Sequence, residues 1–100
     1  MSDPKAIELQ KKHLFQFLAS LSDEAAVEAL LSDLCTDTEI EYMAQRLEGA
    51  RLLLEGATYQ QVMDAVNVSS ATLSRINRCI KRGQGGYSNY LANYLKENKQ

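Results

Sequence analysis

Basic side chains are concentrated in one short stretch of this chain, and phosphate is the group that such side chains bind. Between Ala65 and Gly83 the sequence contains no Asp or Glu, whereas it contains Arg75, Arg78, Lys81 and Arg82. The whole chain carries a formal net charge of -2. The local positive field therefore favours a polyanion such as DNA. The alternative is a solvated helix face whose charges complement the helix dipole.

Small residues precede the basic ones, namely Ser70, Ala71, Thr72 and Ser74. Small side chains allow a helix backbone to approach the major groove of DNA, and hydroxyl groups bond to phosphates or base edges. Ala and the Thr methyl group can contact the thymine methyl. The stretch therefore predicts sequence discrimination at its start and phosphate binding at its end.

A helix-turn-helix over about residues 58–82 is predicted to position these side chains. Val62 and Val66 lie one helical turn apart, Asn67 is suited to a left-handed turn residue, and the apolar pattern resumes at Leu73 and Ile76. Caps are expected at Thr58 for the first helix and at Ser69 or Ser70 for the second. We call the second helix the recognition helix.

Apolar residues at helical spacing predict further helices on both sides of this motif. Their expected ranges are Pro4 to Leu21, Ser22 (as the cap) to Leu34, Thr36 to Glu55, and a last helix around residues 87–95. No segment alternates like a strand, so we predict an all-α fold of about six helices in a single domain over residues 1–100.

Three details refine these helices. Thr36 and Glu39 fit a capping box, and Gly56 suits the left-handed residue after a helix end. Gly49, inside the third helix, marks either a close helix crossing or a tolerated defect. Apolar residues of the first helix, Leu14, Phe17, Leu18 and Leu21, are expected on one face.

The length and composition limit the class of protein. A folded monomer of 100 residues buries only about 60–65% of its unfolded surface, which favours association with a second chain. No apolar run approaches the roughly 20 residues that span a bilayer, and the N-terminus lacks the features of a signal peptide. We expect a cytoplasmic protein without a membrane partner.

Catalytic, metal and cofactor sites are not predicted. Cys35 and Cys79 lie far apart without zinc-site spacing, only His13 could add a nitrogen ligand, and we expect reduced, largely buried thiols. No nucleophile and base are placed for covalent catalysis, so we do not expect an enzyme. The C-terminal tyrosines, Tyr87, Tyr90 and Tyr94, are expected in a core rather than stacked on single-stranded bases.

The segment QRLEGARLLLEGATYQQVMDAVNVSSATLSRINRCIKRG resembles the Trp repressor family, and most its Trp-repressor-related branch. The resemblance covers about Cys35 to Gly83, through the QRL-x-x-AR-x-LL-x-G helix, the TY that begins the next helix, and the ATLSR-x-NRC run. It implies an intertwined homodimer whose core is built from the terminal helices of two chains. It also implies that Ser70, Ala71, Thr72 and Ser74 match the base- and phosphate-contacting stretch, with Gln60 and Met63 at further DNA-facing positions. With the basic residues, the predicted DNA-contacting set is Gln60, Ser69, Ser70, Ala71, Thr72, Ser74, Arg75, Arg78, Lys81 and Arg82.

The resemblance further implies a position for a ligand pocket, at Thr36, Arg46, Arg75, Ile76 and Cys79. In the tryptophan-responsive member a glycine lies where this chain has Ile76, and a serine where it has Cys79. An isoleucine side chain overpacks a site shaped for a flat ring. Tryptophan is therefore not expected as corepressor, any effector is unknown, and Ile76 is expected to hold the recognition helix permanently.

We therefore expect a sequence-specific regulator of transcription that binds double-stranded DNA. The predicted mode is repression by a dimer on a palindromic operator, with recognition helices in successive major grooves about 34 Å apart. The alternative is a protein-interaction module that keeps the helix-turn-helix shape, which the acidic total charge and the neutral Gln60 favour.

Overall fold

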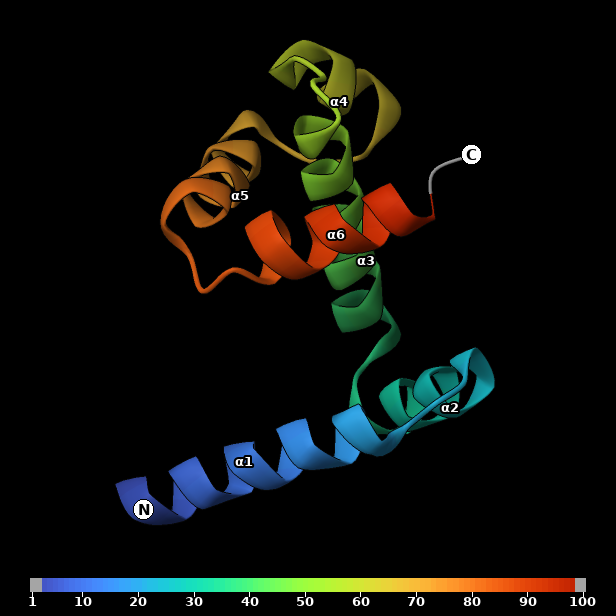
Figure 1. Cartoon of the computed structure of the whole chain (residues 1–100), viewed down its shortest axis with the longest axis vertical. Coiled ribbons are helices and arrows are strands. Elements are labelled where there is room, and N and C mark those ends of the chain that lie inside the picture. The colour runs from blue at the N-terminus through green and yellow to red at the C-terminus, as the bar shows by residue number, and fades with distance from the viewer. Residues whose placement is uncertain (1–2, 99–100) are drawn as a thin grey trace. The chain divides into compact units, whose positions relative to one another are not determined.

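The computed structural model describes residues 3–98, and all regular structure in that range is helical (Figure 1). The elements are α1 (Pro4–Ser20), α2 (Glu24–Leu34), α3 (Asp37–Leu54), α4 (Tyr59–Ala65), α5 (Ser70–Arg82), the π-helical η1 (Gly86–Leu91) and α6 (Ala92–Glu97). The prediction of an all-α fold with about six helices is confirmed. The chain divides into two compact units, one up to Ile40 and one from Glu41, and a single domain stays a prediction.

Side chains at the helix starts determine where the N-terminal helices begin. The Asp3 carboxylate accepts from the backbone N–H of Lys5, and that of Asp23 accepts from Ala26 at 2.8 Å. The predicted cap of α2 at Ser22 was therefore wrong by one residue. Asp23 has the extended backbone of a cap, and its negative charge also interacts favourably with the helix dipole.

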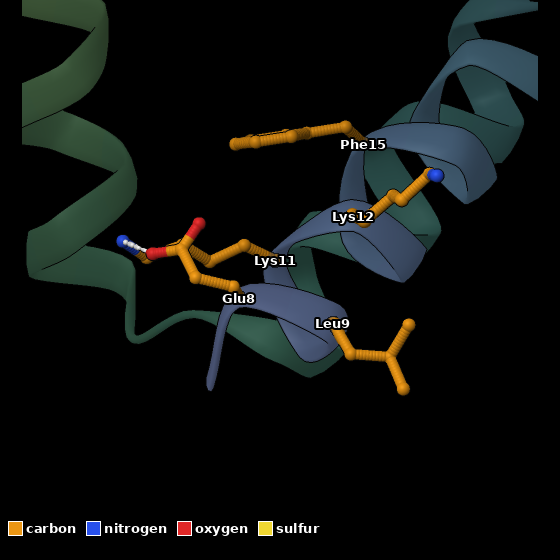
Figure 2. Close-up of a pocket in the computed structure, with 5 residues that line it drawn as sticks. All are labelled: Glu8, Leu9, Lys11, Lys12 and Phe15. Carbon is orange, nitrogen blue, oxygen red and sulfur yellow. Dashed lines mark hydrogen bonds and ion pairs between the residues drawn. The ribbon is translucent and has the colours of Figure 1, made fainter. Parts of the chain in front are cut away.

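The first unit, described for residues 3–40, contains no buried side chain. Of the stripe predicted on the first helix, Leu18 and Leu21 are half-buried, while Phe17 is 54% exposed. Phe15 is 63% exposed and lines a shallow hollow on α1 together with Leu9, as Figure 2 shows. These helices are well capped, but within this unit their apolar side chains have little to pack against.

The second unit contains the core of the described chain. Ala50 from α3, Val62 from α4, and Leu73 and Ile76 from α5 are at most 3% exposed. Gly49 lies beside them, and a Cβ atom at this position would lie 3.4 Å from Leu73 Cδ2. The helices pack closely at Gly49, as predicted, but a Cβ atom would make ordinary van der Waals contacts there, so the structure does not require glycine and does not decide against a tolerated defect.

The two turns that flank α4 differ in backbone conformation. Gly56 has φ 95°, so the predicted left-handed residue after α3 is confirmed. No non-glycine residue between positions 3 and 98 has a positive φ, so the left-handed turn predicted at Asn67 was wrong. Instead, Val66 is extended and the N–H of Val68 donates to its carbonyl at 2.8 Å, a tight turn that needs no left-handed residue.

The chain returns from α5 through glycines into η1 and α6. Gly85 is left-handed with φ 89°, and its carbonyl accepts from the N–H groups of both Asn89 and Tyr90. Tyr87 and Leu91 pack against the core, but Tyr90 and Tyr94 are 73% and 59% exposed. The core position predicted for these two tyrosines was wrong within this chain, since neither packs against the core. No helix within residues 3–98 is long and apolar enough to cross a membrane.

Candidate nucleic-acid interface

Reciprocal capping fixes the start of α4, the first helix of the predicted motif. The N–H of Gln61 donates to the Thr58 hydroxyl at 3.1 Å, and the N–H of Thr58 donates to the Gln61 side-chain carbonyl at 2.8 Å. The predicted cap at Thr58 is confirmed. Because this box satisfies two backbone N–H groups at the helix start, α4 begins at a defined residue despite its length of seven residues.

The start of α5 is fixed in a similar way by Ser69. Its hydroxyl accepts from the N–H of Thr72 at 3.1 Å and donates to the Thr72 hydroxyl at 3.1 Å. Both hydroxyls are therefore engaged within the helix start. Ser70, Ala71 and Ser74 are exposed, so they present the small surface that a groove-entering helix requires.

Opposite faces of α5 differ sharply in chemistry. Leu73 and Ile76 are buried on one face, and the residues predicted to bind phosphate, Arg75, Arg78, Lys81 and Arg82, are all exposed. Ala71, Arg75, Arg78 and Arg82 follow one another at spacings of four, three and four, which places them along one stripe. None of these cations takes part in the ion pairs of residues 3–98, which involve Lys11 and Arg51. The stripe remains available to an external anion.

Arg51 on α3 shows the contrasting case of an arginine whose charge is used within its helix. Its guanidinium donates to Glu48 and, at 2.8 Å, to Glu55. The hydrogen bond from Arg51 lowers the pKa of the Glu48 carboxyl, and the same bond raises the pKa of Arg51. Arg51 is therefore neutralised locally, whereas the α5 stripe keeps its positive field.

Gln60 lies exposed on α4, and its amide nitrogen donates to the Asp64 carboxylate at 2.9 Å. Asp64 was not among the predicted site residues. The spacing of four residues between an amide and a carboxylate on one helix could have indicated it. The Asp64 carboxylate places a negative charge beside Gln60. Asp64 is therefore a further candidate site residue, because its charge acts on any phosphate that approaches α4.

The residues of the predicted ligand pocket have different environments. Ile76 is 3% exposed and belongs to the core, whereas Arg46, Arg75 and Cys79 are exposed. The Thr36 hydroxyl accepts from the N–H of Glu39 at 3.1 Å, and the N–H of Thr36 donates to the Glu39 carboxylate at 2.7 Å, which confirms that capping box. The pocket itself stays a prediction.

The predicted burial of the thiols was wrong for Cys79, which is exposed, while Cys35 is intermediate. Leu73, Ile76 and Ile80 occupy the positions of α5 that face the core, and Cys79 lies outside this row. Among the residues that the structure describes, no group of three or more His, Cys, Asp or Glu side chains is placed to hold a metal ion.

Comparison with known proteins places this geometry in a family. The sequence profile of the Trp repressor protein family matches residues 9–95. The chain is 43% identical over 74 residues to the uncharacterized protein YerC of Bacillus subtilis (strain 168), covering 74% of this chain and 71% of YerC.

Two solved structures share the fold. A Staphylococcus aureus protein provisionally described as a Trp repressor aligns with TM-score 0.81 and 29% identity over 86% of both chains. A TrpR-like protein from Eubacterium eligens ATCC 27750 aligns with TM-score 0.80 and 34% identity over 89% of this chain and 91% of that one. The family consists of regulatory DNA-binding proteins. The chain therefore belongs to the Trp repressor family.

Proposed function

We propose that the protein is a transcriptional repressor that binds double-stranded DNA as a homodimer at a palindromic operator. The observation that carries this proposal is the two-sided character of α5, which is buried through Leu73 and Ile76 and presents an unpaired basic stripe on its outer face. A solvated helix face explains the exposure. It does not explain why small residues precede the cations on α5, or why α5 directly follows the capped helix α4.

The proposed binding mode follows from the order of side chains along α5. Ser70, Ala71 and Ser74 enter the major groove near the helix start and contact base edges. Arg75 and Arg78, with Lys81 and Arg82 beyond them, bind phosphates on the groove wall. Ser69 and Thr72 contribute mainly by holding the helix start, because their hydroxyls are bonded to each other.

The apolar surface of the first unit supports the homodimer. Ile7, Leu9, Leu14, Phe15, Phe17 and Leu34 are exposed, although they are large and hydrophobic. Exposed apolar groups in such number are typical of an interface, and a second copy of the same chain offers a matching surface. A two-fold dimer presents two recognition helices, which suits half-sites about 34 Å apart.

We further propose that L-tryptophan is not the corepressor. Ile76 falls where the tryptophan-responsive relative has glycine, and its side chain is packed into the core beside Ala50. A ligand at this place requires space that the isoleucine already fills. Regulation therefore depends on the amount of protein or on an effector of different chemistry.

Selection of duplexes from a random library tests these proposals. The protein is expected to enrich one sequence with two-fold symmetry, and binding to it is expected to tighten by orders of magnitude over random DNA. Addition of L-tryptophan is expected to leave that affinity unchanged. Failure to enrich any sequence at several salt concentrations, with a folded protein, would instead favour the protein-interaction module.

A further inference from the structure

The close contact around Gly49 joins the two helices of the DNA-binding motif to α3. A Cβ atom at position 49 would lie 3.4 Å from Leu73 Cδ2, 3.5 Å from Ile76 Cδ1 and 3.8 Å from Val62 Cγ1. Side chains of α4 and α5 thus converge on one backbone position of α3. Gly49 and Ala50 are both buried, so this contact is closed to solvent.

The distances define how much space is left at this contact. Separations of 3.4–3.8 Å are ordinary van der Waals contacts, so a single methyl group at position 49 fits without displacing its neighbours. A longer side chain has no room, because Leu73 and Ile76 are 0% and 3% exposed and protein interiors are close-packed. Position 49, where the recognition helix packs on α3, therefore has room for Ala but not for any larger residue.

We infer that Gly49 and Ile76 are positioning residues that fix the orientation of the recognition helix on α3, and thereby set its DNA sequence preference. The inference rests on the proposed DNA-binding function. Neither side of the contact touches DNA, since both residues are buried. Their effect is exerted through the angle at which Ser70, Ala71 and Arg75 leave the protein surface.

The effect of Gly49 and Ile76 arises from the packing of the recognition helix and not from contacts with DNA. A helix seated by close-packed apolar side chains changes orientation only when the packing changes. Base contacts depend on that orientation, whereas phosphate attraction through long cations tolerates small rotations. A change in the packing around position 49 is therefore expected to lower the affinity for the specific sequence more than the affinity for random DNA.

The test compares Gly49→Leu with its matched control, Gly49→Ala, in the full-length protein. Duplex affinity is measured on the sequence selected by the wild type and on random DNA, and each variant is also passed through its own selection. Gly49→Ala is expected to keep the wild-type ratio of specific to non-specific affinity. Gly49→Leu is expected to lower that ratio about tenfold or more, or to select a different half-site spacing.

A second variant keeps the inference testable if Gly49→Leu does not fold. Ile76→Val removes the Cδ1 methyl, which lies 3.5 Å from where a Cβ atom at position 49 would be, and keeps a β-branched apolar side chain. It is expected to lower the specific affinity with random-DNA binding within about twofold, since phosphate contacts dominate the latter. Wild-type specificity and spacing in Ile76→Val, or in a folded Gly49→Leu protein, would overturn the inference.

A readout without DNA separates this inference from the proposed function. Nuclear Overhauser contacts between the Gly49 Hα atoms and the methyl groups of Leu73 and Ile76 are expected in the wild type. The α5 amide resonances are expected to shift in Gly49→Leu and to remain near wild type in Gly49→Ala. If the wild type enriches no duplex, the proposed function fails, and these spectra alone decide whether Gly49 seats α5. Unchanged α5 resonances in Gly49→Leu overturn the inference.

Discussion

The two units of the chain use the same kind of helix but differ in what their helices bury. Residues 41–98 bring Ala50, Val62, Leu73 and Ile76 from three helices into one core. Residues 3–40 form two capped helices and bury no side chain. Local signals therefore suffice to form helices in both units. Among the described residues, fully buried apolar side chains join helices in the second unit, whereas the large apolar side chains of the first unit remain half-buried or exposed.

Charge divides the chain in a related way. No Lys or Arg occurs between Lys12 and Arg46, whereas this stretch contains several acidic residues, including Asp23 and Glu24. The segment from Ala65 to Gly83 has the opposite composition, with cations and no acid. A phosphate backbone is attracted to the second unit and repelled by the acidic stretch. The apolar surface of the first unit is therefore better suited to a protein partner than to DNA.

Leu73→Ala is expected to cause the largest effect, because it empties the core that distinguishes the second unit. Removing a fully buried leucine side chain typically lowers the free energy of unfolding by about 2–5 kcal/mol. Leu73 is 0% exposed. Denaturant unfolding followed by circular dichroism measures this change. A loss comparable to that of an exposed leucine such as Leu9 would contradict the core assignment.

Phe15→Asp tests whether the surface of the first unit is an interface. Phe15 is 63% exposed, so a free monomer is expected to tolerate the change. In a dimer the substitution buries a charge and loses an aromatic contact, and the dissociation constant is expected to rise by at least about tenfold. Sedimentation equilibrium at several concentrations measures it, with Lys5→Asp, which lies outside the hollow lined by Phe15, as a charge control. An unchanged constant argues that this surface is not the interface.

Arg78→Ala probes the positive field of the second unit. Arg78 is exposed on the basic stripe and is proposed to bind phosphate. The change is expected to weaken binding to all duplexes and to reduce the slope of log affinity against log salt by about one unit. Titrations at four or more salt concentrations give the slope. Arg46→Ala, outside α5, is the control. An unaltered salt slope in Arg78→Ala would show that Arg78 does not bind phosphate.

Ser69→Ala and Ser70→Ala separate stability from DNA reading at neighbouring positions. The Ser69 hydroxyl caps α5 through the N–H of Thr72 at 3.1 Å. Its loss is expected to lower the free energy of unfolding by about 1 kcal/mol. Ser70 is exposed, so its change is expected to leave stability nearly unaltered and to relax sequence discrimination. Unfolding and duplex-selection experiments on both variants test this. A loss of stability in Ser70→Ala together with relaxed discrimination in Ser69→Ala would contradict the two roles.

The smallest expected effect concerns the acid range. The backbone N–H of Thr36 donates to the Glu39 carboxylate, and this bond lowers the pKa of Glu39 below its usual value. A lowered folded-state pKa contributes stability at neutral pH that is lost as the pH falls through the folded pKa. The Thr36 side chain makes a smaller contribution in the same direction, so Thr36→Ala, which keeps the backbone N–H, is expected to raise the pKa of Glu39 only part of the way toward its usual value. A carbon-detected NMR titration of the Glu39 carboxyl in the wild type and in the variant measures the shift.

Much of the fold was predictable because its determinants are local. Apolar spacing and capping residues placed the helices, and Thr36, Thr58 and Gly56 act as the sequence indicated. The errors arose where two local solutions compete. Asp23 replaced Ser22 as a cap, and the turn before α5 closes through Val66 and Val68 without a left-handed Asn67.

The composition of the candidate site was also predictable, but not the way its side chains are used. Residue types and spacing indicated an exposed basic stripe, and Arg75 and Arg78 are exposed. The pairing of Ser69 with Thr72, the Gln60–Asp64 bond and the exposure of Cys79 depend on side-chain geometry. The π-helical start of the last helix depends on Gly85, whose left-handed conformation appears only once the chain has to return from α5.

Amide hydrogen exchange in the π-helical segment reports on local opening of the structure. The N–H groups of Asn89 and Tyr90 share one acceptor, the carbonyl of Gly85, at 2.9 and 3.1 Å. Shared bonds in a short π-helix open more readily than those of a regular α-helix. Because Tyr87 and Leu91 of this segment pack against the core, a change that loosens the C-terminal end of α5 is expected to raise the exchange rate of these two amides.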